Sequence, residues 1–226
     1  MNKERTAILI FANTAQFEAE QKAFPSSKML FDKLNTQILK IVNETGLPYY
    51  HFSEKEQIGT TFAERFSNAI AAVFKMGYGQ VITVGNDTPH LKAYHILKAS
   101  NLLEQNKTVI GPSKDGGFYL LGIKKSAFNF QQFQQLPWQT RQLNQCLLAY
   151  EHSNNNEVLY LERLTDIDSI SDVKTIIQSY KALTKKIKCL LLTLIIIKKD
   201  NQSRPFNLNT TRVLKFYFNK GSPLLS

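Results

Sequence analysis

The chain has little cysteine, and this excludes two classes of protein. Only Cys146 and Cys189 occur in 226 residues, which is too few for a disulfide framework. Neither cysteine has another Cys or a His at the spacing of a zinc site. The cysteine content therefore favours a protein of a reducing compartment.

Long apolar runs are also absent. The first residues lead directly into a short apolar stretch, 7–12, and lack the apolar region and cleavage site of a secretory signal. The apolar stretch at 189–197 is far shorter than the ~20 residues that a spanning helix needs. We therefore expect a cytoplasmic protein without a transmembrane segment.

The net charge of +10 is concentrated near the end of the chain. Residues 1–180 hold 18 Lys and Arg against 17 Asp and Glu, whereas residues 181–226 hold 10 against Asp200 alone. Because phosphate contacts supply most of the affinity for nucleic acid, the nearly neutral main part argues against a nucleic-acid-binding surface there. We expect one domain over 1–186 and a basic, apolar appendage over 187–226.

Several catalytic motifs are missing. The sequence has no Walker A loop, no Gly-x-Ser-x-Gly elbow and no Gly-x-Gly-x-x-Gly after the first apolar run. The four histidines are scattered, and His90 and His95 are not at the i, i+4 spacing of a helical zinc pair.

Predicted strands and helices alternate along the chain. Apolar runs at 7–12 and 80–85 are typical of strands buried on both faces. The strands at 108–111 and 118–123 are separated only by a turn, and further strands are expected at 48–53 and 157–163. Helices are expected at 26–46, 61–77, 141–150 and 169–186, and for about 15 residues from Pro89. This order predicts a three-layer α/β/α fold with a mostly parallel mixed sheet and one antiparallel element.

The strongest local signal for chemistry is Asp87, in the segment 85–89 (GNDTP). A carboxylate directly after a buried parallel strand lies at the carboxyl end of the sheet, where open α/β sheets bind ligands. Asp87 could hold a hard divalent cation there. Alternatively, Asp87 or Thr88 is only the cap of the following helix.

Three further segments contain candidate residues. Asp115, Gly116 and Gly117 form either a tight turn or a place where backbone approaches a ligand closely. Asp166 and Asp168 either converge on a cation or begin the next helix. Arg65 lies in a predicted first helical turn, where its charge opposes the helix dipole, so we expect it to pair with a carboxylate or a ligand phosphate.

Together and in this order, these motifs resemble one family: bacterial nucleotide-diphospho-sugar transferase-like proteins of the GT-A fold, which include arsenosugar-biosynthesis glycosyltransferases. More distantly, the chain is similar to phospholactate and molybdenum-cofactor guanylyltransferases. The resemblance covers about residues 6–183, and its most specific part is 57–124. The matching stretches are 57–65, 84–91, 109–122, the weaker 136–140, and 166–168.

The resemblance implies a metal-dependent glycosyltransferase or nucleotidyltransferase that uses a nucleotide-sugar or nucleotide. It implies Mg²⁺ or Mn²⁺ on Asp87 and Asp168, and catalytic roles for Asp87 and Asp115. The residues that it implies for substrate or nucleotide binding are Gln57, Gly59, Arg65, Asn86, Gly116, Gly117 and Trp138.

The stretch 13–25 departs from the family pattern of a glycine- and lysine-rich loop after the first strand. It contains no glycine and carries Glu18 and Glu20, and Lys22 and Lys28 are the nearby cations. The alternative function is therefore a non-catalytic GT-A-like module that binds a small ligand or a partner protein.

The basic, apolar stretch that begins near Lys185 has two interpretations. It either docks as a helix or strand on the domain or on a second copy of the chain, or lies on an anionic membrane surface. We favour docking, with a homo-oligomer as one outcome.

Overall fold

Six strands form one mixed sheet in the computed structural model, which describes residues 4–22, 24, 26–153, 156–179 and 183–202. The strand order across the sheet is β2-β1-β3-β5-β4-β6. The strands are β1 (Thr6–Phe11), β2 (Tyr49–Phe52), β3 (Gln80–Val84), β4 (Lys107–Pro112), β5 (Phe118–Lys124) and β6 (Glu157–Tyr160).

Only β5 runs against its neighbours. It pairs antiparallel with β3 and β4, whereas β1 is parallel to β2 and β3, and β4 is parallel to β6. The expected α/β fold with one antiparallel element is therefore confirmed. Because the other five strands share one direction, their carboxyl ends all meet at the same edge of the sheet.

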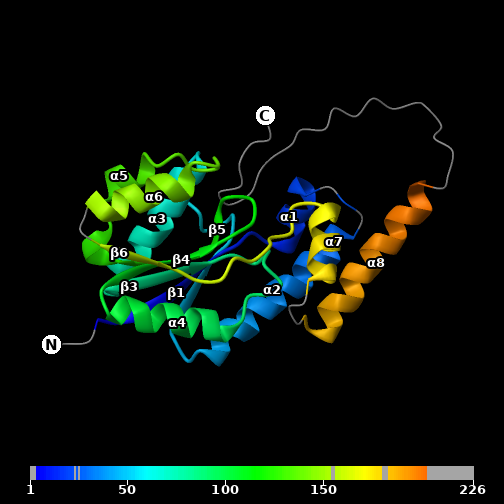
Figure 1. The fold of residues 1–226 in the computed structure, drawn as a ribbon, viewed down its shortest axis with the longest axis horizontal. Helices are drawn as coiled ribbons and strands as arrows, with labels where there is room; N and C mark the ends of the chain where they lie inside the picture. Colours follow the sequence, from blue (N-terminus) through cyan, green and yellow to red (C-terminus); the bar gives the residue numbers. More distant parts are fainter. Residues whose placement is uncertain (1–3, 23, 25, 154–155, 180–182, 203–226) are drawn as a thin grey trace.

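Helices cover both faces of the sheet (Figure 1). Alternate residues of β1 point to opposite faces. Leu9 and its neighbours on one face pack under α3 (Phe62–Lys75), α5 (Phe130–Gln134) and α6 (Leu143–Ser153). Ile8 and Ile10 pack on α2 (Ser27–Glu44) and α4 (Ala93–Glu104). Burial on both faces explains why β1 and β3 are apolar runs rather than alternating ones.

Two predicted helix starts are correct. Thr61 and Glu64 form a capping box at the start of α3, and Ser169 and Asp172 form one at α7 (Ile170–Gln178). In each box a side-chain oxygen satisfies backbone N–H groups that have no partner within the helix.

Three predicted boundaries are wrong. The helix expected from Pro89 begins only at Ala93, because residues 86–91 form a buried turn that is tied to the loop after β6. The helix expected over 169–186 is α7, which ends at Gln178, and a separate helix, α8 (Lys185–Gln202), begins where the prediction ended. A short helix, α1 (Ala15–Gln21), with Thr14 as its N-cap, lies in the stretch expected to be a loop.

The appendage is helical where the structure describes it, and it docks on the domain. Apolar residues of α8, among them Leu191 and Leu194, are buried with residues of α1, α2 and α7. Figure 1 shows α8 alongside α7, next to α2. No helix in the described ranges combines the length and apolar character needed to cross a bilayer. The boundary at residue 186 stays a prediction, and residues 203–226 of the expected appendage lie outside the described residues.

The docking of α8 predicts unequal effects for two adjacent leucines. Leu191 is fully buried, whereas Leu192 is 40% exposed. Leu191→Ala should lower the free energy of unfolding by about 2–5 kcal/mol because it leaves a cavity. Leu192→Ala, the matched control, should change it by about 0.5 kcal/mol or less. Urea denaturation measures both, and equal small effects would contradict the docking.

Candidate functional site

Two loops bring an acidic cluster together at the carboxyl edge of the sheet. Asp87 follows β3, and Asp166 and Asp168 follow β6. The backbone N–H of Ile167 donates to the backbone carbonyl of Asp87 at 2.9 Å and holds the two loops in register. The structure therefore brings together three carboxylates that the sequence singled out.

Lys22, just beyond the end of α1, bridges this cluster. Its Nζ lies 2.9 Å from Asp168 Oδ1 and 3.5 Å from Asp87 Oδ2, and it donates to the backbone carbonyl of Ile167 at 2.7 Å. The Lys22 side chain is 5% exposed, so its charge is held away from water. Since an ammonium has three N–H donors, these three acceptors use all of them.

The surroundings shift two pKa values in this cluster. Burial alone would lower the pKa of Lys22, but the charges of Asp168 and Asp87 outweigh it and raise this pKa above its usual range. Burial raises the pKa of Asp166 well above its usual value, and the charges of Asp87 and Asp115 raise it further. The Thr88 hydroxyl donates to Asp166 and offsets part of this shift.

As placed, these residues do not fit the Mg²⁺ or Mn²⁺ expected on Asp87 and Asp168. Hard cations need several oxygen ligands, but the Lys22 ammonium already bridges these two carboxylates and takes the carbonyl of Ile167. In the described part of the chain, no group of three or more His, Cys, Asp or Glu side chains is arranged to hold a metal ion. A cation at this place would require Lys22 to move away.

A pocket of ≈ 310 Å³, which we call the Gln57 pocket, opens beside this cluster at the ends of β1 and β2. This volume is at the lower end of the range for small-molecule sites. The pocket brings together three residues predicted from the sequence, Gln57, Gly59 and Arg65. The other residues that line it are Phe11, Asn13, Phe17, Glu54 and Phe62.

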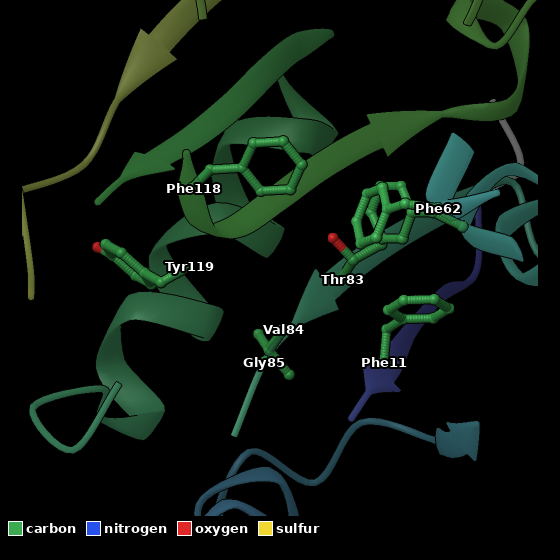
Figure 2. Close-up of a pocket in the computed structure, with 8 residues that line it drawn as sticks. Phe11, Phe62, Thr83, Val84, Gly85, Phe118 and Tyr119 are labelled. Carbon is green, nitrogen blue, oxygen red and sulfur yellow. The ribbon is translucent and has the colours of Figure 1, made fainter. Parts of the chain in front are cut away.

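The apolar wall of the Gln57 pocket continues into a much smaller cavity. Phe11 and Phe62 also line this cavity, together with residues at the end of β3 and the start of β5 (Figure 2). These further residues are Phe66, Thr83, Val84, Gly85, Phe118 and Tyr119. Its volume of ≈ 20 Å³ has room for about one water molecule. It is therefore a packing gap behind the pocket and not itself a ligand site.

Polar groups in the Gln57 pocket are held by the surrounding chain. The Gln57 side-chain amide donates to Asn13 Oδ1 at 3.3 Å and to the carbonyl of Phe52 at 3.1 Å. Glu54 accepts from the backbone N–H and the hydroxyl of Thr14, both at 2.7 Å. Burial would raise the pKa of Glu54, but these two hydrogen bonds leave it lowered, so Glu54 is a carboxylate at neutral pH.

Two residues at the start of α3 shape the rim of the pocket. Gly59 has φ of +133°, and a Cβ there would lie 2.6 Å from Glu64 Cβ and 2.9 Å from the Arg65 nitrogen, so only glycine fits. The Arg65 guanidinium donates to the carbonyl of Thr60 at 3.0 Å. The Thr60 carbonyl is a neutral acceptor, so this hydrogen bond is not the contact with a carboxylate or phosphate that we expected for Arg65.

A chain of side-chain amides connects the pocket to the acidic cluster. Asn13, which contacts Gln57, accepts through its carbonyl from Asn35 at 3.4 Å, and Asn35 Oδ1 accepts from Asn86 at 2.7 Å. Asn86 is the residue before Asp87, and its own Oδ1 is buried without a hydrogen-bond partner among the described residues. The predicted site residue Asn86 therefore positions loops rather than lining the pocket.

The segment with Asp115, Gly116 and Gly117 forms a turn that closes on itself. Asp115 accepts from the backbone N–H of Gly117 at 3.0 Å and from the hydroxyl of Ser113. Gly116 has φ of +99°, and Asn144 donates to the carbonyls of both glycines. These contacts fit the tight-turn interpretation, and the turn does not line the Gln57 pocket. The Asp115 carboxylate nevertheless lies close enough to Asp166 for its charge to raise the pKa of Asp166.

Trp138, expected to bind substrate, lies in the core. Its Nε1 donates to the carbonyl of Phe133 at 2.9 Å, and its ring lies 5.0 Å from that of Phe133 and 5.3 Å from that of Phe66. It is 9% exposed.

The sequence analysis missed Lys22, Asn13, Phe17 and Glu54 as site residues. One local signal was available: Thr14 caps a helix whose third residue, Phe17, faces the pocket. Lys22 carried no such signal, because its acceptors are 65 and 145 residues away in the chain.

Comparisons with known proteins support the fold. Residues 49–140 match the family model DUF2064, described as "Uncharacterized protein conserved in bacteria". A crystal structure of a candidate nucleotide-diphospho-sugar transferase from Desulfovibrio desulfuricans G20 aligns with a TM-score of 0.72 at 21% identity, over 86% of this chain and 97% of that one. The sheet and its helices are therefore those of the nucleotide-diphospho-sugar transferase fold.

More distant structures align less well. Rv0371c from Mycobacterium tuberculosis H37Rv has a TM-score of 0.50 at 10% identity, over 79% of this chain and 100% of that one. A 4-diphosphocytidyl-2C-methyl-D-erythritol synthase from Anaerococcus prevotii DSM 20548 reaches 0.45 at 13% identity, over 86% and 100%. No curated protein matches the sequence.

The raised pKa of Asp166 predicts a pH-dependent effect of Asp166→Asn. A carboxyl whose pKa is higher in the folded than in the unfolded chain stabilises the fold at low pH and loses this contribution as pH rises through the folded value. Asn does not titrate, so the stability of the variant relative to wild type should increase from about pH 4 upward.

Urea denaturation between pH 5 and 8 measures this difference. Asp32→Asn, on the exposed side of α2, is the control for removing one negative charge from a solvated position. A relative stability of Asp166→Asn that stays constant or falls with rising pH would contradict the shifted pKa.

Proposed function

We propose that this protein is a transferase that binds a nucleotide-activated donor, either a nucleotide-sugar or a nucleoside triphosphate, in the Gln57 pocket. The observation that carries the proposal is the pocket itself. It combines aromatic rings, side-chain amides and an arginine at the carboxyl edge of the sheet, and such edges are where open α/β sheets bind ligands.

The lining of the pocket suits a nucleoside. The rings of Phe11, Phe17 and Phe62 provide apolar surface on which a base can stack, an interaction worth about 1–3 kcal/mol per base. The amides of Asn13 and Gln57 offer both donors and acceptors to the polar edge of a base or to ribose hydroxyls.

Charge orients the donor within the pocket. Glu54 repels phosphate, whereas Arg65 attracts it. We therefore expect the neutral nucleoside on the Glu54 side and the phosphates towards Arg65. In the reaction, an acceptor would attack the activated carbon or phosphorus of the donor and release a nucleotide or diphosphate leaving group. No step of this proposal passes through a divalent metal, because Asp87 and Asp168 are engaged by Lys22.

A second candidate is the non-catalytic module, which would bind the same ligand without turnover. The observation that favours it is α1: the segment after β1 is a helix with Glu18 and Glu20, and all three N–H groups of Lys22 are already used. Binding experiments test both candidates, and only turnover separates them.

The pocket can be tested by measuring Tm with and without each of several ligands: UDP, GDP, CTP, GTP, and UDP- and GDP-linked sugars. A ligand at about 100 times its Kd contributes roughly 2.7 kcal/mol to stability, which for a chain of this size raises Tm by roughly 5–10 °C. Arg65→Ala should weaken binding roughly ten- to a hundredfold, because it removes a charge-assisted hydrogen bond to phosphate.

Lys75→Ala is the matched control, since Lys75 is a cation at the opposite, exposed end of the same helix. The assignment of the pocket would be overturned if no nucleotide raised Tm. It would also be overturned if Arg65→Ala and Lys75→Ala weakened nucleotide binding equally. Binding without release of the nucleotide product from any nucleotide-sugar, across a panel of acceptors, would favour the non-catalytic module.

A further inference from the structure

We propose that the Lys22 ammonium is a built-in cation that replaces a divalent metal between Asp87 and Asp168, so that this edge of the sheet is complete without metal. The inference concerns the same end of the sheet as the proposed function, which assigns no step to these carboxylates. It concerns cation binding alone, however, and can be tested without nucleotide.

The contacts of Lys22 are those of a bridging cation. It contacts one carboxylate oxygen from the loop after β3 and one from the loop after β6, and it also binds the backbone carbonyl of Ile167. The three oxygens belong to different residues and converge on one atom. A single charged group therefore holds together two loops that are separated by about eighty residues of chain.

The charge balance requires a cation here. Asp166 lies close enough to Asp87, Asp115 and Asp168 for the charges of these three carboxylates to raise its pKa, in addition to the effect of burial. Asp87 is 4% exposed, and buried charges are strongly destabilising unless they are paired. The raised pKa of Lys22 shows that the surrounding carboxylates favour its charged form despite burial. The Lys22 ammonium thus supplies the positive charge that this cluster needs.

The position of Lys22 is fixed by the segment that precedes it. Thr14 caps α1 and is bound to Glu54, and Asn13 donates to the buried Glu18 at 3.1 Å. The Lys22 Nζ also lies 5.1 Å from the centre of the Phe31 ring. These contacts hold the first part of α1 and the Lys22 side chain, so the ammonium is a fixed part of the fold.

A divalent cation and this ammonium cannot share the site. An ion that contacted both carboxylates would lie close to Nζ, where like charges repel strongly at low local dielectric. Two of the oxygens it would need are also engaged: the carbonyl of Ile167 by Lys22, and Asp166 Oδ1 by Thr88. The intact chain should therefore not bind Mn²⁺ here, and removal of Lys22 should expose a metal site.

This inference can be tested by titrating the protein with Mn²⁺ in the absence of nucleotide. The EPR signal of free Mn²⁺ measures how much of the ion is bound. Wild type should show no saturable site on the domain. Lys22→Ala removes the charge and opens space, and should bind one Mn²⁺ per chain at least about tenfold more tightly than wild type. Its Tm should fall in EDTA and recover when Mn²⁺ is added. Lys40→Ala, which removes an exposed lysine of α2, should behave as wild type.

Saturable Mn²⁺ binding by wild type that is lost in Asp168→Asn would overturn the inference. The inference would also be overturned if Lys22→Ala folded but bound Mn²⁺ no more tightly than wild type. If Lys22→Ala does not fold without metal, Lys22→Ala combined with Asp168→Asn provides a second variant, which should regain stability without gaining the Mn²⁺ site. Because no nucleotide is present, these results are independent of whether the Gln57 pocket binds one.

Discussion

The ion pairs of Lys22 with Asp87 and Asp168 are the interaction on which the rest of this site depends. A buried ammonium or carboxylate is strongly destabilising unless it is paired or hydrogen-bonded. The fold therefore has to bring α1 and the loops after β3 and β6 to one point. Once α1 is fixed there, Phe17 and Asn13 are placed at the Gln57 pocket, so the pocket and the acidic cluster share one support.

The direction of the strands makes this convergence geometrically simple. With β5 reversed, β3 and β4 run in the same direction although they are not adjacent, and the loops after β1, β2, β3 and β6 all leave the same edge of the sheet. The amide contacts from Gln57 through Asn13 and Asn35 to Asn86 then connect loops that follow different strands. Such a network fixes loop positions at the cost of leaving Asn86 Oδ1 without a partner among the described residues.

The parts of this structure that were predictable from sequence are those with a short-range cause. Because β1 and β3 are buried on both faces, each is a continuous apolar run in the sequence. The capping-box residues at Thr61 and Ser169 predict the starts of α3 and α7. The place of Asp87 at the sheet edge follows from its position after β3. The roles of Lys22 and Trp138 could not be predicted in this way, because each is set by partners brought near only by the tertiary fold. Pro89 failed as a helix start for the same reason, since the turn after Asp87 is held by the distant loop after β6.

The helix α1 determines which positive charge the carboxylates at this edge of the sheet contact. The fold fixes where the strand ends and their carboxylates lie, but it does not fix what neutralises them. A glycine-free segment that winds into a helix places a side chain at a constant distance from β1, and here that side chain is Lys22. A flexible segment at the same point would leave the carboxylates open to solvent and to metal ions. In this chain the residues after β1 place a lysine at the carboxylates, and we infer that it takes the position of a bound cation there.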